Sequence, residues 1–213
     1  TDMEIAELQS LSCEVTQEGS VTTPAHILYD IVRKLPDDAI IELESQEGKK
    51  LEIKTDKTSF SLMCLPPNDF PDIHSGEYPE GFYIDTLSLS RLIDKTIFSV
   101  STEETRYYLN GIYLHSIKEN DIEVLRAVAT DGHRLSRLSA DLPKNANDLE
   151  GVIIPRKTVT EIKKIIDNQD GTAKVQIAKN KIKFTINNVI ITSKLLDGAF
   201  PDYERVIPNN NTK

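Results

Sequence analysis

Two stretches of this chain resemble each other: KKLEIKTDKTSFSLMCLPPNDFPD, residues 49–72, and NKIKFTINNVIITSKLLDGAFPD, residues 180–202. Each contains short β-rich segments divided by turn residues, and each ends in FPD, 130 positions apart (200 − 70). Alternation of apolar and polar residues with period two is typical of antiparallel strands. The repeated stretch therefore predicts two related sheets in one chain.

The similarity continues upstream. Pro24 opens TPAHILYDIVRKL and Pro155 opens IPRKTVTEIKKII, 131 positions later (155 − 24), while Thr1-Asp2 recurs as Thr130-Asp131. Several ordered matches at nearly one spacing indicate a duplicated unit rather than chance. We expect the back half of one unit of about 130 residues, then a complete second unit, and hence a longer parent chain.

Apolar spacing predicts the elements. Helices are expected over 24–35 and 86–98, each with one buried face, and from Pro155 onward. An Asn-Asp turn at 120–121 is expected to join two strands. The strands are expected within residues 40–45, 50–55, 59–65, 82–85, 107–120, 121–140, 174–178, 181–186 and 189–196. Each unit is then α+β, with helices packed on one face of an antiparallel sheet. The proline-rich segment 66–82 is the best domain boundary.

The amino-acid composition limits the class of protein to which this chain can belong. Of 213 residues, 38% are hydrophobic and 28% charged, which is typical of a globular protein, and no apolar run approaches the ~20 residues that span a bilayer. No secretory leader is visible, and the chain begins at Thr1. Cys13 and Cys64 fit neither a CxxC motif nor a metal spacing with histidine, so we expect buried cytosolic thiols. The net charge of −9 argues against nucleic acid, but only the local distribution of charge decides.

The predicted helices carry cations away from their apolar faces. At 100° per residue, Val159 and Ile162 share one side of the third helix, while Arg156 and Lys157 lie roughly opposite. We place Lys163 and Lys164 on the same basic side. Arg33-Lys34 and Arg91 with Lys95 are similarly placed, and Arg106-Tyr107-Tyr108 adds a cation and two aromatic rings. These faces are either ordinary solvated surfaces or a positive surface for a phosphate backbone.

The stretch ATDGHRLSRLS, residues 129–139, allows three interpretations. It lacks a partner set for nucleophilic or acid-base catalysis, and one histidine with one aspartate is too few ligands for a metal. Asp-Gly between β-rich runs favours a hairpin turn instead. We expect Thr1-Asp2 to share this turn, with Met3-Glu4-Ile5 in place of GHR.

Taken together, RYYLNG (106–111), VATDGHRLS (128–136), IPRK (154–157) and SKLLDGAFPDYERVIP (193–208) resemble the bacterial DNA polymerase III beta subunit, the replicative sliding clamp. TTPAHILYDIVRKLPDD and SFSLMCLPPNDFPD are similar to the same family's first domain. The resemblance implies a DNA clamp fold, with residues 1–75 as the rear of the first domain, 76–207 as the second domain, and 208–213 leading to a third.

The resemblance also implies functions. Members close head to tail as homodimers into a ring around duplex DNA, without sequence preference, cofactor, metal or catalytic residues of their own. A surface pocket would bind peptides of the DNA polymerase III catalytic subunit, the clamp loader and other replication and repair proteins, in the bacterial cytoplasm at the nucleoid. The implied pocket residues are Leu109, Thr130, Gly132, His133, Arg134, Leu135, Pro201, Arg205 and Val206. The implied DNA contacts are Arg33, Lys34, Arg91, Lys95, Arg106, Tyr107, Tyr108, Arg156, Lys157, Lys163 and Lys164, and the implied dimer contacts are Phe60, Ser61 and Leu62.

Two points qualify these expectations. Glu103 and Glu104 precede RYY and would weaken contact with DNA at that loop. Without a third domain the chain is expected to bind peptides more weakly and not to close the ring. The alternatives are a scaffold that uses the pocket without encircling DNA, and a hydrolase that uses Asp131 and His133.

Overall fold

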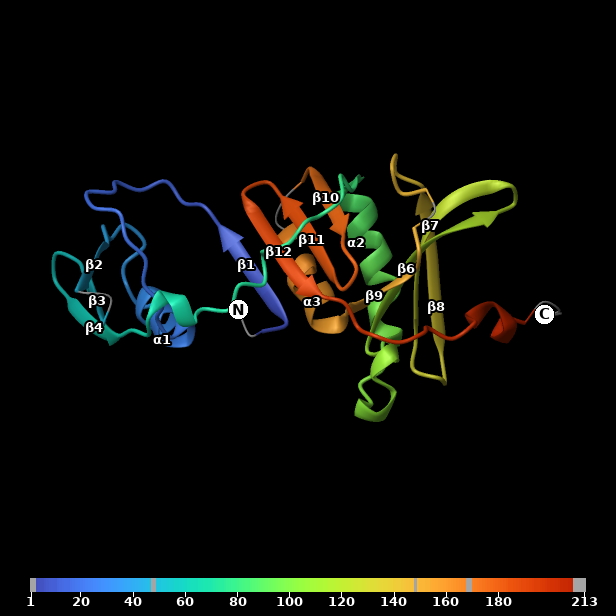
Figure 1. Ribbon diagram of the computed structural model, residues 1–213, viewed down its shortest axis with the longest axis horizontal. Helices are drawn as coiled ribbons and strands as arrows, with labels where there is room; N and C mark the ends of the chain where they lie inside the picture. The colour runs from blue at the N-terminus through green and yellow to red at the C-terminus, as the bar shows by residue number, and fades with distance from the viewer. Residues whose placement is uncertain (1–2, 47–48, 148, 168–169, 209–213) are drawn as a thin grey trace. The chain divides into compact units, whose positions relative to one another are not determined.

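The computed structural model describes residues 3–46, 49–147, 149–167 and 170–208. The chain forms two compact units, which we call the larger unit, residues 1–10 and 73–213, and the smaller unit, residues 11–72 (Figure 1). The larger unit contains β1(Ile5–Gln9), β5(Phe82–Asp85), α2(Thr86–Asp94), β6(Gly111–Glu119), β7(Ile122–Thr130), β8(Leu135–Asp141), β9(Val152–Pro155), α3(Arg156–Ile166), β10(Thr172–Ile177), β11(Lys181–Ile186) and β12(Val189–Lys194). The smaller unit contains α1(Ala25–Val32), β2(Glu42–Gln46), β3(Lys50–Lys54) and β4(Ser59–Met63).

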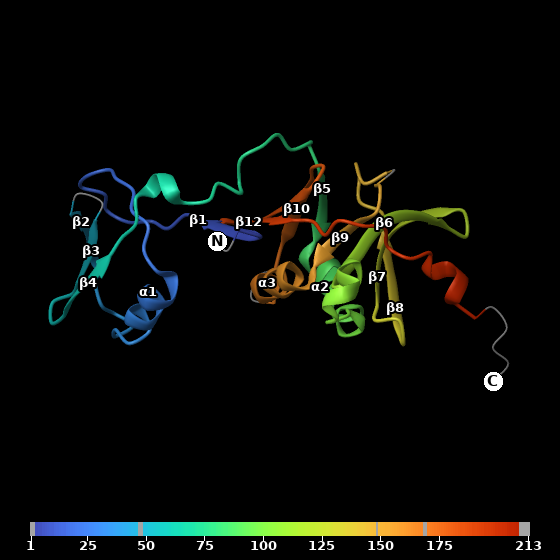
Figure 2. The same cartoon turned by 60° about the horizontal axis from the view of Figure 1, so that its bottom comes forward.

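All described strand pairs are antiparallel. The larger unit has a five-stranded sheet in the order β1-β12-β11-β10-β5 and a four-stranded sheet in the order β8-β7-β6-β9. Helices α2 and α3 lie side by side and pack against these sheets (Figure 2). The α+β class is therefore confirmed.

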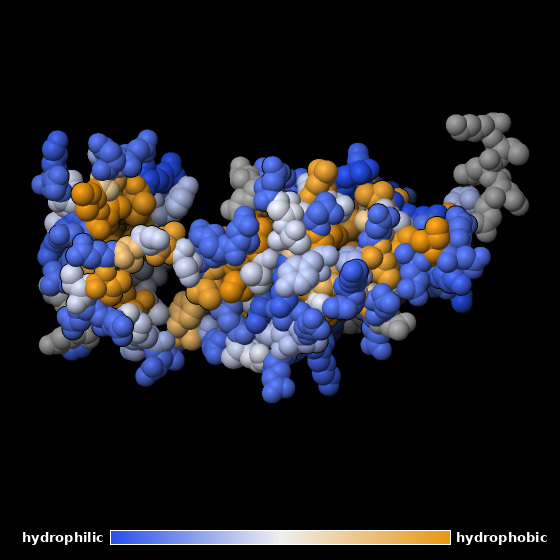
Figure 3. Space-filling view, turned by 90° about the horizontal axis from the view of Figure 1, so that it is seen from above, coloured by the Kyte–Doolittle hydropathy of each residue, from blue (hydrophilic) through white to orange (hydrophobic). Residues whose placement is uncertain are grey.

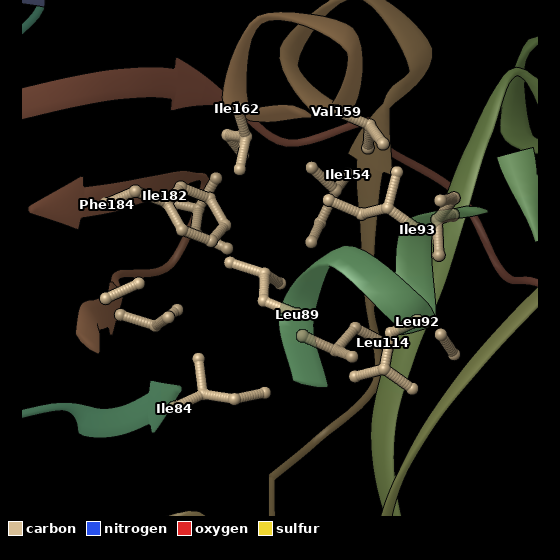
Figure 4. Close-up of a cluster of buried hydrophobic side chains, with 14 of the residues drawn as sticks. Ile84, Leu89, Leu92, Ile93, Leu114, Ile154, Val159, Ile162, Ile182 and Phe184 are labelled. Carbon is tan, nitrogen blue, oxygen red and sulfur yellow. The ribbon is translucent and has the colours of Figure 1, made fainter. Parts of the chain in front are cut away.

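The core of the larger unit lies between the helices and the sheets. Leu89 of α2 and Ile162 of α3 point toward Ile84 and Phe184 of the five-stranded sheet, and Leu92 of α2 lies beside Leu114 of the four-stranded sheet (Figure 4). The apolar spacing of both helices predicts these faces. This shared core fixes α2 and α3 beside one another, with their polar sides turned outward.

The internal repeat is visible in the elements. Adding 131 to the bounds of α1, β2, β3 and β4 gives residues within α3, β10, β11 and β12. The isolated bridge between Thr22 and Leu65 becomes, with the same addition, the bridge between Ile153 and Leu196. The turns agree at an offset of 129: Met3 has φ 78° and Gly132 has φ 88°. Residues Thr1-Asp2, which we expected to share the hairpin turn, lie outside the described residues.

One strand departs from the predicted domain order. β1 comes from the part of the chain assigned to the first domain, yet it pairs with β12, and residues 1–10 belong to the larger unit. A strand from the first repeat thus extends a sheet of the second repeat. The predicted division at residue 75 stays a prediction, with this strand crossing it.

The smaller unit is thinly packed. Its buried core consists of Leu51, Ile53 and Leu62, and no residue of α1 is buried. The prediction of a fully buried face on this helix is wrong: Leu28 and Ile31 are half-buried and pack on the core. Apolar side chains reach the surface of this unit (Figure 3). The three core residues, which come from β3 and β4, offer too little surface to cover the apolar stripe of α1.

Three further predictions differ from the structure. The helix expected over 86–98 ends at Asp94 and continues as a separate 3-10 turn, 97–99. Residues 104–109 form 3-10 turns instead of a strand, so β6 begins at Gly111. Cys13, expected to be buried, is exposed, and Cys64 is only half-buried. Cys13 lies between β1 and α1, within residues 11–20, all of which are exposed.

Candidate functional site

The TDGHR segment is a tight turn between β7 and β8. Oδ1 of Asp131 accepts hydrogen bonds from the backbone N–H groups of His133 and Arg134, both at 2.9 Å, and Oδ2 accepts one from Nε of Arg134 at 2.9 Å. The Thr130 hydroxyl donates to the Arg134 carbonyl at 2.7 Å and accepts from Gly132 N–H at 3.1 Å. Both carboxylate oxygens of Asp131 are thus committed to the turn, which confirms the hairpin interpretation.

These bonds also set the charge state of the turn. Hydrogen bonds from the Arg134 and His133 backbone lower the pKa of Asp131 to about 2. Such a carboxylate is a poor general base near neutral pH. Within the described residues, no three His, Cys, Asp or Glu side chains are grouped to hold a metal ion.

We predict that Asp131→Ala destabilises the chain in a pH-dependent way. The folded pKa of Asp131, about 2, lies below its ordinary value of 3.8, so this carboxylate stabilises the fold above pH 3.8. The contribution is lost as pH falls through 2. Chemical unfolding from pH 7 to pH 2 should therefore show wild type and Asp131→Ala converging at low pH. Glu123→Ala is the control at an exposed site on the neighbouring strand β7, and a constant difference at every pH would contradict the prediction.

The side chain of Arg106 lies against the turn at Gly132. Its guanidinium pairs with the Glu103 carboxylate, Nη2 to Oε1 at 2.7 Å and Nε to Oε2 at 2.9 Å. A Cβ on Gly132 would lie 2.5 Å from Nη1 of Arg106, so the turn admits only glycine without a shift of that side chain. The hydrogen bond from Arg106 also lowers the pKa of Glu103. Arg106 is therefore engaged within the protein, as the acidic residues before RYY suggested.

Beside the turn, a cavity of about 590 Å³ lies along β8. Its apolar lining comes from β8 and from residues 206–208, and its cations come from α2, from the residue that follows α2, and from β8. The apolar residues are Leu135, Leu138, Val206, Ile207 and Pro208, and the cations are Arg91, Lys95 and Arg137. Mostly apolar walls with a few charged groups are typical of a site that binds a ligand or a peptide.

The structure brings together some predicted pocket residues and not others. Leu135 and Val206 line this cavity, whereas His133 and Arg134 line a second, more polar cavity of about 240 Å³ with Asp131. Leu109 is only 3% exposed and lines neither cavity. Pro201 precedes the segment 203–206 that carries Val206, Arg205 lies within that segment, and both are exposed.

The segment that carries Val206 is held by a buried polar network. Arg126 of β7, 2% exposed, pairs with Glu119 at 2.7 Å and with Glu204 at 3.3 Å. The Tyr203 hydroxyl lies 3.4 Å from Nη1 of Arg126 and 3.0 Å from Nε2 of His115. Burial lowers the pKa of His115, which favours its neutral form. This network ties the segment 203–206 to the sheet.

Aromatic stacking adds to this attachment. The ring of Tyr113 lies 4.7 Å from Phe200, nearly parallel to it, and 4.7 Å from His115. Arg126, His115 and Tyr203 are functional-site residues that were not predicted from the sequence. The one available signal was a cation within the apolar run VLRAVA.

The cations on the helices are not equivalent. Lys163 lies at the border of α2 and α3, where it pairs with Asp94 at 2.8 Å and Asp167 at 2.6 Å and donates to Ser90 at 2.6 Å. Burial by itself would lower the pKa of Lys163, but the two carboxylates raise it overall. Its expected outward position on the basic face is therefore wrong, because it lies 100° from the centre of the apolar side and reaches α2.

Other predicted DNA contacts remain at the surface. Lys164 pairs with Glu161 at 2.9 Å and Arg33 lies 3.9 Å from Asp30. Arg156 is exposed and, within the part of the chain that the structure describes, forms no ion pair. Tyr107 is half exposed, and its ring meets Tyr108 edge to face at 5.9 Å.

Comparison with known proteins agrees with this fold. The family model for the DNA polymerase III beta subunit, central domain, matches residues 83–202, and the model for its N-terminal domain matches residues 1–74. The chain therefore belongs to the DNA polymerase III beta subunit family. The beta sliding clamp of Caulobacter vibrioides is 44% identical over 214 residues, covering 100% of this chain and 58% of that protein. The clamp of Escherichia coli K12 is 38% identical over 214 residues, covering 100% and 57%.

Solved structures give the same result. The sliding clamp of Bartonella birtlesii bound to griselimycin has a TM-score of 0.95 and 44% identity, covering 100% of this chain and 57% of that one. A Caulobacter crescentus clamp has a TM-score of 0.94 and 44% identity, covering 100% and 58%. The chain thus spans somewhat over half the length of these relatives. No helix in the described residues is long and apolar enough to cross a membrane.

Proposed function

We propose that this chain is the central part of a sliding clamp, a non-enzymatic ring that tethers DNA polymerase III to duplex DNA. Family membership supports this, and the pairing of β1 with β12 is the observation that carries it. A strand of the first repeat joins the last sheet of the second, so consecutive domains associate head to tail through strand edges. Repetition of one head-to-tail contact is what a closed ring of similar domains requires.

In this proposal residues 1–75 are the rear of the first domain, 76–207 the second, and 208–213 lead to a third. The outer edge of β4, with Phe60, Ser61 and Leu62, is the dimer contact. It is the repeat equivalent of the β12 edge that β1 occupies. The complete protein would act in the bacterial cytoplasm at the nucleoid, and it would need no metal or cofactor.

The proposed contact with DNA is weak and independent of sequence. Cations on the outer sides of α1, α2 and α3 attract phosphates, which carry no sequence information, so bound DNA can slide. Arg156 and Lys34 are exposed and suit this role, whereas Lys163 and Arg106 are held by carboxylates. Topological closure, not affinity, then keeps the clamp on DNA.

We predict that Arg156→Gln reduces binding to any short duplex and lowers the slope of log K against log salt by about 1, the value for one lost phosphate contact. Lys163→Gln is the matched control on the same helix. Its ion pairs with Asp94 and Asp167 already use its charge, so the slope should not change although thermal stability falls. Fluorescence anisotropy at several salt concentrations measures both. Equal slopes for the two variants would contradict this assignment.

The proposed partner site is the β8 cavity and the adjoining turn. Leu135 and Val206 supply apolar contacts for the anchors of a peptide, and His133 and Arg134 supply polar contacts at its border. Partners of this site would be the DNA polymerase III catalytic subunit, the clamp loader and other replication and repair proteins. Because a third domain would add another wall, this chain alone should bind such peptides more weakly than a complete clamp.

A chimera tests the proposal in a complete ring. Residues 1–213 would replace the 214 matched residues of the Caulobacter vibrioides clamp. We expect the chimera to be loaded on nicked circular DNA, to support processive synthesis and to leave the DNA after linearisation. Peptide binding without loading would favour the alternative, a scaffold that does not encircle DNA. The parent Caulobacter clamp is the positive control.

A further inference from the structure

His115 lies at the end of the buried network that holds the segment 203–206. It is 8% exposed on β6, and the pairing of β6 with β7 places it directly opposite Arg126. Its ring stacks on that of Tyr113, 4.7 Å away, and both of its ring nitrogens have polar partners. Histidine is the side chain whose charge ordinarily changes near neutral pH. Uptake of a proton by His115 would therefore change the network from within.

The contacts of the two ring nitrogens define the tautomer of His115. Nδ1 lies 3.1 Å from the Ser116 carbonyl oxygen, which can only accept, so Nδ1 carries a proton. In the neutral ring Nε2 is then an acceptor, and the Tyr203 hydroxyl, 3.0 Å away, donates to it. The oxygen of the same hydroxyl accepts from Nη1 of Arg126 at 3.4 Å. The hydrogen bonds thus run in one direction, from Arg126 through Tyr203 to His115.

A proton on Nε2 of His115 conflicts with this arrangement. Nε2 and Nη1 of Arg126 would then both donate to the oxygen of Tyr203. The hydroxyl proton would lose the acceptor that the described contacts give it, which is costly in a buried place. The new charge would also lie beside the guanidinium of Arg126, whose carboxylate partners, Glu119 and Glu204, are already paired.

The titratable and charged groups around His115 and its network come from three elements. They are Tyr113 and Glu119 of β6, Arg126 of β7, and Tyr203 and Glu204 of the 3-10 turn 203–206. Burial is the main cause that lowers the pKa of His115. The charge of Arg126 lowers this pKa further, and the Ser116 carbonyl and Glu204 raise it without restoring the ordinary value of 6.5. His115 is therefore mostly neutral in the folded chain at pH 6.5 and above.

We propose that neutral His115 is a positioning residue of the partner site: through Tyr203 it holds the segment that carries Val206, and uptake of one proton on Nε2 releases that segment. Val206 supplies an apolar contact for a partner peptide in the proposed function, on which this inference rests. His115 lines neither described cavity, so it acts on the peptide through Tyr203 and not by contact. Acidification should therefore weaken partner binding even for a peptide that has no titratable group of its own.

The direction of the pH dependence follows from the lowered pKa of His115. The held segment favours the neutral ring, whereas in the released segment the ring regains water and its ordinary pKa of 6.5. The stability of the held state is complete above pH 6.5 and is lost as the pH falls from 6.5 through the lowered pKa. Release takes up one proton, so partner affinity should fall by at most about tenfold per pH unit. Asp131 does not contribute in this range, because its pKa is about 2.

Nuclear magnetic resonance of the 213-residue chain without peptide tests whether His115 holds the segment. We expect the ring nitrogen resonances to show a proton on Nδ1 and none on Nε2 at about pH 8. As the pH is lowered to about 5, the Val206 methyl resonances should shift with the same midpoint as the His115 ring. In His115→Gln this shift should be absent. Three results would overturn the inference: a proton on Nε2 at about pH 8, a ring that stays neutral down to about pH 5, or Val206 methyl groups that do not follow the ring.

Peptide titrations test the effect on partner binding, with a short polymerase-derived peptide that has hydrophobic anchors and no histidine. All proteins carry His133→Gln, because His133 is a second histidine at the proposed site. In this background the affinity should be constant above about pH 6.5 and fall severalfold by about pH 5. His115→Gln, whose amide oxygen can accept from Tyr203, should keep the affinity at high pH and remove the fall. His115→Phe keeps an aromatic ring to stack on Tyr113 but has no acceptor, so it should bind weakly at every pH.

The two experiments separate failure of this inference from failure of the proposed function. An affinity that is the same at about pH 8 and about pH 5, or a fall that His115→Gln leaves in place, would show that His115 does not position Val206 for the peptide. If His115→Phe does not fold, the comparison of His115→Gln with its parent still decides the point. Absence of peptide binding at every pH would count against the proposed partner site, and the resonances of His115 and Val206 would still show whether the proton releases the segment.

Discussion

Arg126→Ala should lower the free energy of unfolding of the larger unit by about 3 kcal/mol. The guanidinium is almost fully buried and pairs with Glu119 and Glu204. Its removal leaves a cavity and takes a donor from Tyr203 and from Ser139, whose hydroxyl accepts from Nε of Arg126 at 3.0 Å. Both carboxylates are partly exposed and can regain water, so we expect the lower end of the range for a broken buried ion pair.

The same substitution should weaken peptide binding at temperatures where the variant is folded. Arg126 and Tyr203 hold the segment 203–206, and Val206 at its end lines the β8 cavity. Arg126 does not line the cavity, so it acts as a positioning residue. Glu204→Gln, which removes one ion pair at the surface of the network, should weaken binding with a smaller loss of stability.

Urea unfolding and a peptide titration at the same temperature measure the two effects. Arg137→Ala is the stability control, because this arginine is exposed on the adjacent strand β8. If Arg126→Ala unfolds at the wild-type urea concentration, the network contributes no stability. If peptide affinity stays unchanged in both Arg126→Ala and Glu204→Gln, the network does not position Val206.

Much of this fold could be predicted because the repeat occurs at the level of elements. The Asn120-Asp121 turn is present, with φ of 49° and 65°, values that these residue types adopt more readily than others. The hairpin at Asp131-Gly132 was predictable for the same local reason. Helix α3 was predictable because its apolar residues recur with the helical period. Such features depend on residues close together in sequence.

The features that could not be predicted depend on distant contacts. Lys163 was expected at the surface, yet Asp94, 69 residues earlier, holds it against α2. Arg126 reaches Glu204 across 78 residues of chain. The exposure of α1 and of Cys13 depends on what the rest of the smaller unit can cover. Periodicity indicates which face of an element is apolar, and it contains no information on whether a partner covers that face.

The second large effect is expected at the pocket itself. Val206→Asp should reduce affinity for a short polymerase-derived peptide with hydrophobic anchors by about 30-fold or more, the effect of losing one hot-spot contact. Val206 is 69% exposed, so the substitution should not disturb folding. A carboxylate there would have to lose water when an apolar anchor binds, and that loss opposes binding.

Ile122→Asp provides the matched control. Ile122 is 67% exposed at the start of β7 and lines neither described cavity. Both variants remove one exposed apolar side chain and add one negative charge, so they change net charge and surface hydropathy equally. If both reduce affinity alike, the peptide responds to overall charge rather than to the β8 cavity.

Comparison with the Caulobacter chimera extends this test to the missing wall. Wild-type chain and chimera share Leu135, Val206 and the TDGHR turn, and they differ in the domains that flank them. If the cavity is one wall of a larger pocket, the chimera should bind the peptide more tightly, and Val206→Asp should weaken both proteins. Equal affinity of chain and chimera would mean that the larger unit alone forms the site. An additional apolar wall in contact with the peptide would bury more apolar surface and would therefore raise the affinity.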